Sequence, residues 1–490
     1  MSTGNTIETL NNSPAPVPIQ SGGDRGKIPV MAIFDIGKTN KKFFLFDENL
    51  KEVYQEYISF KEITDDDDFP CDDLQLIEQW VLKTYDAIAL NEKYEITAIN
   101  FSAYGATMVH LDKELKPVTH LYNYTKIIPD NILQKFKLSY DPEGKWPEET
   151  ASPLLGMLNA GLQLYWLKND KPALFAKIKY SVFLPQYLSY LFSKVLLTEY
   201  TGIGCHTGMW NFEFNHFHQW MYAEGFAELI PPIHLKEVVK LPGSNIVIGM
   251  GIHDSSAALL PYISGNTAPF ILLSTGTWSI CLNPFNDTIL SQYELKQDCL
   301  CYLQPNGQKV KASRLFLGNE YNSWIKKLSL FFGVDDAYHK KLFFDKALYE
   351  KAERVLSPLF HWSSIEHPNN KITRLSNINL SWFDNYEEAY HHLLKELVEL
   401  QVEKIRLVVN NISVKRMFVD GGFVDNSIFI NILSQKLPDF EIIPSSMPLG
   451  SAIGAALAIH KGNTESIPGD LNLIELNMYT APKEVNENIF

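Results

Sequence analysis

The sequence predicts an α/β protein of two domains, and three observations support this fold class. Segments of strand character alternate with segments of helical apolar spacing through most of the chain. The chain is too long to fold around a single hydrophobic core, so two domains of roughly 200 to 250 residues are expected. Two hairpins of the same design, one near the start and one past the middle, suggest two related halves that face one ligand.

The composition is that of a globular protein, with 46% apolar, 12% aromatic and 20% charged residues. A formal net charge of −14 disfavours nucleic acid as a general partner, although a local basic turn can still bind phosphate. No run of 18 apolar residues occurs, so no membrane association is expected. Five cysteines without metal-ligand spacing, and the lack of an apolar signal segment, predict a cytoplasmic protein with reduced thiols.

The first hairpin is the most informative segment. Residues 31–42, MAIFDIGKTNKK, read as a buried strand that reaches Asp35 and enters a polar turn. Gly37 frees the backbone to bend, and exposed N–H groups in such a turn can bind an anion such as a triphosphate. The alternative is an ordinary hairpin with solvated lysines. The candidate phosphate donors are Thr39, Asn40 and Lys41.

Three further segments carry glycine at a strand end or a turn. Residues 270–282, FILLSTGTWSICL, form the second hairpin, with Gly276 and Thr277 at its tip. Residues 251–259, GIHDSSAAL, form a glycine-led turn into a helix. Farther on, the strand MFVD meets Gly421 and Gly422 before another helix, where two glycines allow a flat ligand to approach the backbone. A helix of small residues at 448–456, PLGSAIGAA, allows close packing.

In this order and spacing the segments resemble those of the FGGY carbohydrate kinases of the sugar kinase, Hsp70 and actin superfamily. DIGKTNKK and STGTWS resemble the two phosphate loops of the family, GIHDSSAALLPY its catalytic segment, and DGGFVDNSIFINIL its adenosine motif. Within that family, the chain most resembles members of the rhamnulokinase and fuculokinase type. The resemblance implies two actin-like (ribonuclease H-like) α/β domains with a nucleotide cleft between them.

The resemblance also sets the expected domain limits. Residues 1–28, rich in Ser, Thr, Asn, Pro and Gly, predict a flexible arm. Residues 29–260 are expected to form the N-terminal domain and residues 261–482 the C-terminal domain, followed by a tail at 483–490. Within the second domain, residues 386–411 predict a long amphipathic helix that packs on the sheet.

The catalytic roles follow from the resemblance. Asp254 matches the general base that takes the proton of the sugar hydroxyl during phosphoryl transfer, and the alternative role is a helix N-cap. Its neighbour His253 is a candidate sugar contact or a structural histidine. Asp35 matches the aspartate near Mg²⁺, held through water, and the alternative is a turn-stabilising residue.

The remaining cofactor residues are implied in the same way. Gly37, with the donors of the first turn, is expected to bind ATP phosphates opposite Gly276 and Thr277. Gly421 and Gly422 are expected to admit the adenosine, with a plain tight turn as the alternative. Asn426 is a candidate adenine or ribose contact, or else a helix cap.

The sugar pocket is expected at the turn that follows the strand at 96–102, with Gly105, Ala106 and Thr107 as candidate contacts. The glycine-rich segment 201–210, after a strand expected at 196–200, is a second candidate wall or else a surface turn. Two positions depart from the family pattern. Gln163 stands where a Lys is usual, which concerns the subfamily, and residues 122–126 lack the usual Asp and Arg, which argues against a glycerol substrate. The acidic run at 65–68 predicts a solvated loop.

The sequence therefore predicts an ATP- and Mg²⁺-dependent kinase of a small-molecule sugar, with a ketose such as a 6-deoxyhexulose or pentulose as the expected substrate. The sequence does not decide whether the protein forms a homodimer. Two rivals share the fold: a nucleotide-switched scaffold like actin or Hsp70, and a sugar-binding pseudokinase without turnover. Sugar-stimulated ADP release would separate the kinase from both.

Overall fold

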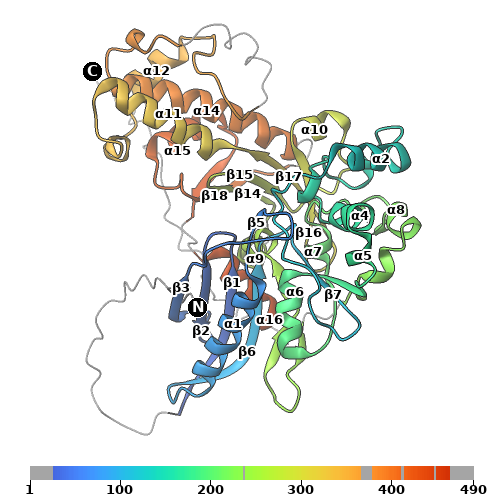
Figure 1. Cartoon of the computed structure of the whole chain (residues 1–490). Helices are drawn as coiled ribbons and strands as arrows, with labels where there is room; N and C mark the ends of the chain where they lie inside the picture. Colours follow the sequence, from blue (N-terminus) through green and yellow to red (C-terminus); the bar gives the residue numbers. More distant parts are fainter. Residues whose placement is uncertain are drawn as a thin grey trace, which may run out of the picture.

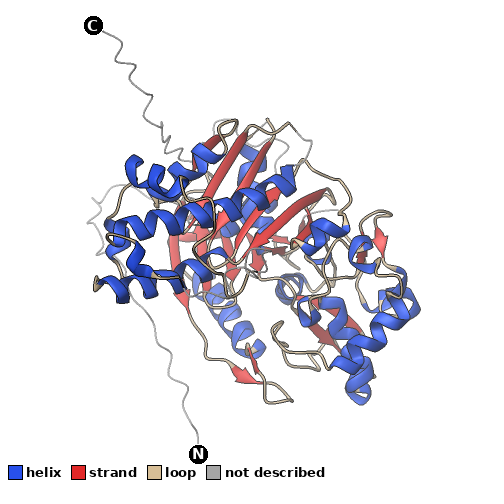
Figure 2. Ribbon diagram, turned by 90° about the horizontal axis from the view of Figure 1, so that it is seen from above, coloured by secondary structure: helices blue, strands red, loops and turns tan. Residues whose placement is uncertain are grey.

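The computed structural model describes residues 26–234, 238–266, 268–365, 378–409, 413–445 and 449–463. Two β-sheets with flanking helices form its framework (Figure 1), and seen from above the helices surround the strands (Figure 2). The fold class predicted from the sequence is confirmed. Most of the expected N-terminal arm, the end of the expected second domain and the tail lie outside the described residues.

The first sheet has the strand order β11-β12-β6-β1-β2-β3, and β13 also pairs with β6. β1 runs antiparallel to β2 and parallel to β6, so the first polar turn joins β1 to β2 at one edge of the parallel region. The strands are β1 (Ile28–Ile36), β2 (Lys41–Phe46), β3 (Glu52–Ile58), β6 (Tyr94–Ala103), β11 (Val238–Lys240), β12 (Val247–Gly249) and β13 (Ile252–His253).

The second sheet has the order β16-β17-β15-β14-β18-β19. Its β17-β15-β14-β18-β19 part repeats the antiparallel, antiparallel, parallel, parallel pairing of β3-β2-β1-β6-β12. The expectation of two related halves is therefore confirmed at the level of topology. The strands are β14 (Phe270–Thr275), β15 (Ser279–Asn283), β16 (Cys299–Leu303), β17 (Lys309–Leu315), β18 (Arg416–Gly421) and β19 (Glu441–Pro444).

Helices cover the sheets and form a lobe beside the first one. The expected long helix is α14, whose buried face packs on β17, β15 and the helices α11, α12 and α15. The helices are α1 (Leu74–Ala89), α2 (Asp130–Tyr140), α3 (Trp146–Glu149), α4 (Ala160–Asp170), α5 (Pro172–Phe175), α6 (Leu184–Ser193), α7 (Tyr200–Ile203), α8 (Gln219–Ala223), α9 (Asp254–Gly265), α10 (Gln292–Lys296), α11 (Leu317–Phe332), α12 (Lys346–Glu353), α14 (Tyr386–Val409), α15 (Ser427–Lys436) and α16 (Gly450–Asn463).

Shorter elements complete the described chain. Three two-stranded pairs join β4 (Ile63–Thr64) to β5 (Pro70–Cys71), β7 (Met108–Leu111) to β8 (Tyr180–Phe183), and β9 (Trp210–Asn211) to β10 (His216–Phe217). Single 3₁₀ turns are η1 (Gly156–Leu158), η2 (Ala227–Leu229), η3 (Tyr338–Lys341) and η4 (Leu380–Trp382). All five cysteines are buried and carry free thiols.

The helix α16 crosses back from the second half of the sequence to the first sheet. It packs on α9, β6, β1 and β12, and Figure 1 shows it beside β1 and α9. The contact with α9 needs glycine, because a Cβ on Gly454 would overlap the carbonyl oxygen of Ala257. The expected C-terminal domain is thus not one contiguous unit, since its small-residue helix completes the core of the first domain.

Candidate active site

Asp35 lies buried at the end of β1, where it meets three other elements. Its Oδ2 accepts a hydrogen bond from the Ser451 hydroxyl of α16 at 3.0 Å and lies 3.4 Å from the Lys42 ammonium. Burial raises the pKa of Asp35; Lys42 opposes this shift and the charge of Asp254 adds to it. Asp35 and Asp254, assigned to one site from the sequence, therefore share one electrostatic environment.

Lys41, expected as a phosphate donor, points elsewhere. Its side chain is 1% exposed, and its Nζ lies 2.7 Å from Asp72 Oδ1 and 3.0 Å from the carbonyl oxygen of Lys38. The Lys38 ammonium reaches the same Asp72 at 2.8 Å. Because adjacent strand residues face opposite sides, Lys42 rather than Lys41 shares the face of Asp35. A phosphate contact by Lys41 would require breaking a buried ion pair, so Lys42 is the better placed cation, which the sequence analysis missed.

The signal for Lys42 was present in the hairpin pattern. Asp35 and Lys42 are directly paired across β1 and β2, whereas Lys41 pairs with Ile36. The turn between the strands is closed by the N–H of Gly37, which donates to the Asn40 carbonyl oxygen at 3.0 Å. Thr39 and Asn40 are exposed at its tip, as a phosphate-binding role requires.

The second turn lies against the glycine segment assigned to adenosine. Gly276 and Thr277 are exposed, and the N–H of Gly276 donates to the Trp278 carbonyl oxygen at 2.9 Å. The carbonyl oxygen of Thr275 accepts the N–H of Gly422 at 2.6 Å. Gly421 has φ +83°, and a Cβ there would overlap that same oxygen, so this position requires glycine. The structure therefore brings the second turn and the glycine pair together.

Asn426 acts as a helix cap. Its Oδ1 accepts the N–H of Phe429 at 3.1 Å, and its Nδ2 donates to the Tyr390 hydroxyl at 2.8 Å. Both ends of the amide have protein partners, so the capping alternative describes the geometry, and the adenine or ribose contact stays a prediction.

Asp254 stands at the first position of α9, directly after the cap residue His253. Its Oδ1 accepts the N–H of Ser255 at 2.6 Å, and about a third of its side chain (34%) is exposed. Burial raises the pKa of Asp254 to about 6, and the Ser255 hydrogen bonds and Lys42 offset this shift only in part. A partly buried carboxylate with a raised pKa at a helix start can accept a proton from a neighbouring group.

His253 lies between Asp254 and the wall of the first domain. Its Nε2 is 3.1 Å from both Asp254 Oδ1 and Cys205 Sγ, and its ring stacks on Tyr302 of β16. Burial lowers the pKa of His253 to about 3, so the ring is neutral at physiological pH. A neutral imidazole held in this way leaves the charge of the site on Asp254.

The turn Gly105–Thr107 packs against this histidine. A Cβ on Gly105 would come within 2.8 Å of His253 Nε2, so only glycine fits. Ala106 has φ +55°, and its carbonyl oxygen accepts a hydrogen bond from Gln163 Nε2 at 2.8 Å. The Thr107 hydroxyl donates to the Gly105 carbonyl oxygen at 3.1 Å. Gln163, noted as a departure from the family, therefore holds this turn, whose polar groups are largely bound within the protein.

The segment 201–210 is neither a loop after a strand nor a surface turn. No ladder strand forms at 196–200; instead α7 begins at Tyr200, and Glu199 caps it by accepting the N–H groups of Thr201 and Gly202. A carboxylate that caps a helix favours helical over extended backbone at this point. Residues 201–210 are buried.

The helix α9 joins the two halves of the site. Asp254 lies at its start, and farther along Tyr262 donates its hydroxyl hydrogen to Asp420 Oδ2 at 3.1 Å. Asp420 precedes the glycine pair, and its carbonyl oxygen accepts the Thr275 hydroxyl of the second turn. The helix α9 thus connects the candidate base with the glycine segment and the second turn.

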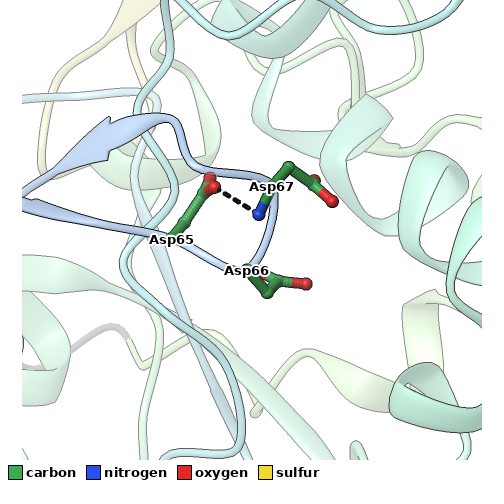
Figure 3. Close-up of side chains that lie close together, drawn as sticks. All are labelled: Asp65, Asp66 and Asp67. Carbon is green, nitrogen blue, oxygen red and sulfur yellow. Dashed lines mark hydrogen bonds between the residues drawn. The ribbon is translucent and has the colours of Figure 1, made fainter.

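The acidic run at 65–68 contains a cluster of side chains that could in principle hold a metal ion, Asp65, Asp66 and Asp67 (Figure 3). Asp65 is buried and accepts the N–H of Asp67 at 2.8 Å. Lys126 Nζ lies 2.5 Å from Asp65 and 2.6 Å from Asp67, and Lys171 pairs with Asp66 at 2.7 Å. Two ammonium groups already pair with the three carboxylates. The predicted loop is confirmed, with residues 66–68 exposed, but Asp65 is buried and the loop is ion-paired.

Comparison with known proteins agrees with this geometry. Residues 30–249 match the model for the N-terminal domain of the FGGY family of carbohydrate kinases. A rhamnulokinase of Mannheimia succiniciproducens is 24% identical over 262 residues, 51% of this chain and 52% of that protein, so the match spans about half the length of this curated relative. The sequence similarity to the FGGY carbohydrate kinases thus covers residues 30–249, a little less than half of the chain.

Solved structures share the fold over nearly the whole chain. A carbohydrate kinase from Novosphingobium aromaticivorans superposes with a TM-score of 0.72 at 22% identity, covering 89% of this chain and 92% of that one. Xylulose kinase from Lactobacillus acidophilus gives 0.74 at 14% identity, covering 92% and 93%. Plasmodium falciparum glycerol kinase with ADP gives 0.72 at 15% identity, again covering 92% and 93%. Within the described ranges, no helix has the length and apolar character to span a membrane.

Proposed function

We propose that the protein transfers the γ-phosphoryl group of ATP to a sugar hydroxyl, with Asp254 as the general base. The observation that carries this proposal is the position of Asp254: partly exposed at the start of α9, with a pKa raised to about 6, in the same electrostatic environment as Asp35. A base with a pKa near this value is mostly ionised at neutral pH and still accepts a proton readily.

The residues around Asp254 support the proton transfer. Asp254 accepts the proton of the attacking hydroxyl as the bond to phosphorus forms. His253, neutral and 3.1 Å from Asp254 Oδ1, orients the carboxylate, while both of its ring nitrogens have partners within the protein. Phosphoryl transfer asks the protein mainly for positioning and charge stabilisation, and the helix start at Asp254 supplies a local positive potential.

The two turns and the glycine pair fit a nucleotide. Thr39, Asn40, Gly276 and Thr277 are exposed at the tips of their hairpins, and a Cβ on Gly422 would have only Thr275 O within 4 Å, at 3.8 Å. This open space above the backbone of Gly422 suits a flat adenosine. When bound, ATP would supply the phosphoryl group, and Asp35, beside Lys42 at the end of β1, is our candidate for binding Mg²⁺ through water.

The proposed acceptor is a ketose, a 6-deoxyhexulose or a pentulose. The turn Gly105–Thr107 offers few free polar groups, because Gln163 and Thr107 satisfy its carbonyl oxygens. In the segment 122–126, Lys126 is bound to Asp65 and Asp67 and is not available to a ligand. A wall with few free donors favours a sugar with an apolar end, since an unpaired buried polar group is costly.

The test is a coupled assay of ADP release with a panel of ketoses, aldoses and polyols, run on the wild type and on Asp254→Asn. We expect sugar-dependent ADP release that falls by about 10² to 10⁴ in Asp254→Asn while ATP binding persists. ATP binding without sugar-stimulated release would favour the scaffold, and tight sugar binding without turnover would favour the pseudokinase. Near-wild-type turnover of a folded Asp254→Asn would remove the base assignment.

A further inference from the structure

The turn that leads into Asp254 is held by side chains from three elements. Gly251, with φ +79°, donates its N–H to Asn100 Oδ1 at 3.0 Å. Its carbonyl oxygen accepts a hydrogen bond from Gln186 Nε2 at 3.1 Å. The N–H of His253 donates to the Thr201 hydroxyl oxygen at 2.9 Å. Buried side chains thus bind the backbone of the turn at Gly251 and at His253, the residue before the candidate base.

Two of these anchors end at one carboxylate, that of Glu199. Glu199 Oε1 accepts the Thr201 hydroxyl at 2.7 Å, the Gly202 N–H at 2.6 Å and Gln186 Nε2 at 3.1 Å. Its Oε2 accepts the Thr201 N–H at 2.6 Å. Glu199 is 6% exposed, and no ion pair to it occurs within the part of the chain that the structure describes. These four donors are more than the capping of a four-residue helix requires.

The direction of the hydrogen bonds matters for Asp254. A threonine hydroxyl has one hydrogen, and here Glu199 accepts it, so a lone pair of the oxygen faces the N–H of His253. The carboxylate therefore fixes the polarity of the Thr201 hydroxyl. Without that acceptor the hydroxyl hydrogen could turn toward the N–H of His253 and repel it.

We propose that Glu199 and Thr201 are positioning residues for the general base: the chain Glu199–Thr201–His253 holds the peptide before Asp254 and so sets the direction of its carboxylate. The proposal rests on the proposed function of Asp254. It assigns Glu199 no proton transfer and no substrate contact. Displacing a catalytic group by a fraction of an ångström lowers the rate without weakening ligand binding.

The first test compares Thr201→Val with Thr201→Ser. Valine has nearly the shape of threonine but no hydroxyl, whereas serine keeps the oxygen and loses a methyl group. We expect kcat to fall by about tenfold in Thr201→Val, with unchanged KM for ATP, and to recover in Thr201→Ser. Equal kcat in the two variants would overturn the proposal.

The second test uses a matched pair of buried carboxylates. Glu396 on α14 is 7% exposed and accepts two backbone N–H groups, of Leu359 at 2.7 Å and Phe360 at 3.1 Å, in the second domain. Burial raises the pKa of Glu199 and of Glu396 to about 7 in each case. Glu199→Gln should lower kcat about tenfold more than Glu396→Gln. A similar loss in both variants would make the effect one of stability alone and contradict the proposal.

A third measurement separates this proposal from the proposed function. If Thr201 acts through the base, then Thr201→Val should cost no further turnover in the Asp254→Asn background; a full additional loss would overturn the proposal. Hydrogen exchange of the His253 amide needs no turnover. We expect it to be faster in Thr201→Val than in Thr201→Ser, and an equal rate would overturn the proposal even if no phosphoryl transfer is found.

Discussion

The Ser451 hydroxyl donates a hydrogen bond to Asp35 Oδ2 at 3.0 Å, although the two residues are 416 positions apart in the sequence. Asp35 closes the first strand, and Ser451 lies in the first turn of the last described helix. The contact is possible because α16 packs on α9 with the closeness that Gly454 permits. The carboxyl group of Asp35 therefore receives a hydrogen bond from a helix near the end of the described chain.

The raised pKa of Asp254 predicts a specific pH dependence. The base must be ionised to accept a proton, so kcat/KM for the sugar should fall tenfold per pH unit below about 6 and level off above about 7. Lowering the pH protonates Asp254 and removes the acceptor, which gives the sign of the effect. Initial rates between pH 5 and 8 at low sugar concentration measure the profile. A rate that stays level down to pH 5 would show that Asp254 is not the titrating base.

Two adjacent lysines should behave differently when each is changed to methionine. Lys41 is buried against Asp72, so Lys41→Met leaves a buried carboxylate with fewer partners and should lower the free energy of unfolding by about 3 kcal/mol. Lys42 is 29% exposed beside Asp35, and Lys42→Met should change stability by less than about 1 kcal/mol but raise the KM for ATP. Denaturant unfolding and ATP titration measure the two effects. The opposite pattern would return the phosphate role to Lys41.

Much of the fold could be predicted because it depends on local signals. Strands around glycine turns and the apolar stripe of α14 are properties of short segments, and they were placed within a few residues. The return of α16 to the first sheet was not predicted, because a helix of small residues indicates close packing but not its partner. The helix at Tyr200–Ile203 was also missed, since its stabilising cap depends on a buried Glu199.

The candidate site shows the same division. Asp254, both turns and the glycine pair could be proposed from motifs, because each motif consists of a few consecutive residues. The motif does not give the direction of the side chains. Lys41 and Lys42 are adjacent in a strand and therefore point to opposite faces. Lys41 forms an ion pair with Asp72, whereas Lys42 contacts Asp35. The holding roles of Gln163 and Thr201 depend on contacts between distant segments.

Valine substitutions at Gly422 and at Gly421 should have different effects, so each variant serves as a control for the other. A side chain at Gly422 meets only one atom at 3.8 Å, so Gly422→Val should fold and weaken ATP binding by filling the space assigned to adenosine. At Gly421, where φ is +83° and a Cβ would overlap the Thr275 carbonyl oxygen, Gly421→Val should lower stability itself. Isothermal titration with ATP and thermal unfolding compare them. Unchanged ATP affinity in folded Gly422→Val would exclude this segment from the nucleotide site.

The choice of sugar is the prediction that depends most on the wall near His253. Because Gln163 binds the Ala106 carbonyl oxygen and Thr107 binds that of Gly105, the turn has little left to offer a terminal hydroxyl. An unpaired hydroxyl buried against such a wall loses its hydrogen bonds to water, whereas a methyl group loses nothing.

We therefore expect a ketose to be the best acceptor, with L-rhamnulose or L-fuculose at least as good as a fully hydroxylated ketose. Glycerol should be at least about tenfold poorer in kcat/KM, a difference of about 1.4 kcal/mol in transition-state binding. Gln163→Leu provides the internal test: it frees the Ala106 carbonyl oxygen, which should narrow the preference for the deoxy sugar if this turn faces the substrate. Glycerol or an aldose as the preferred acceptor would contradict the ketose prediction and leave the fold and the proposal for Asp254 unaffected.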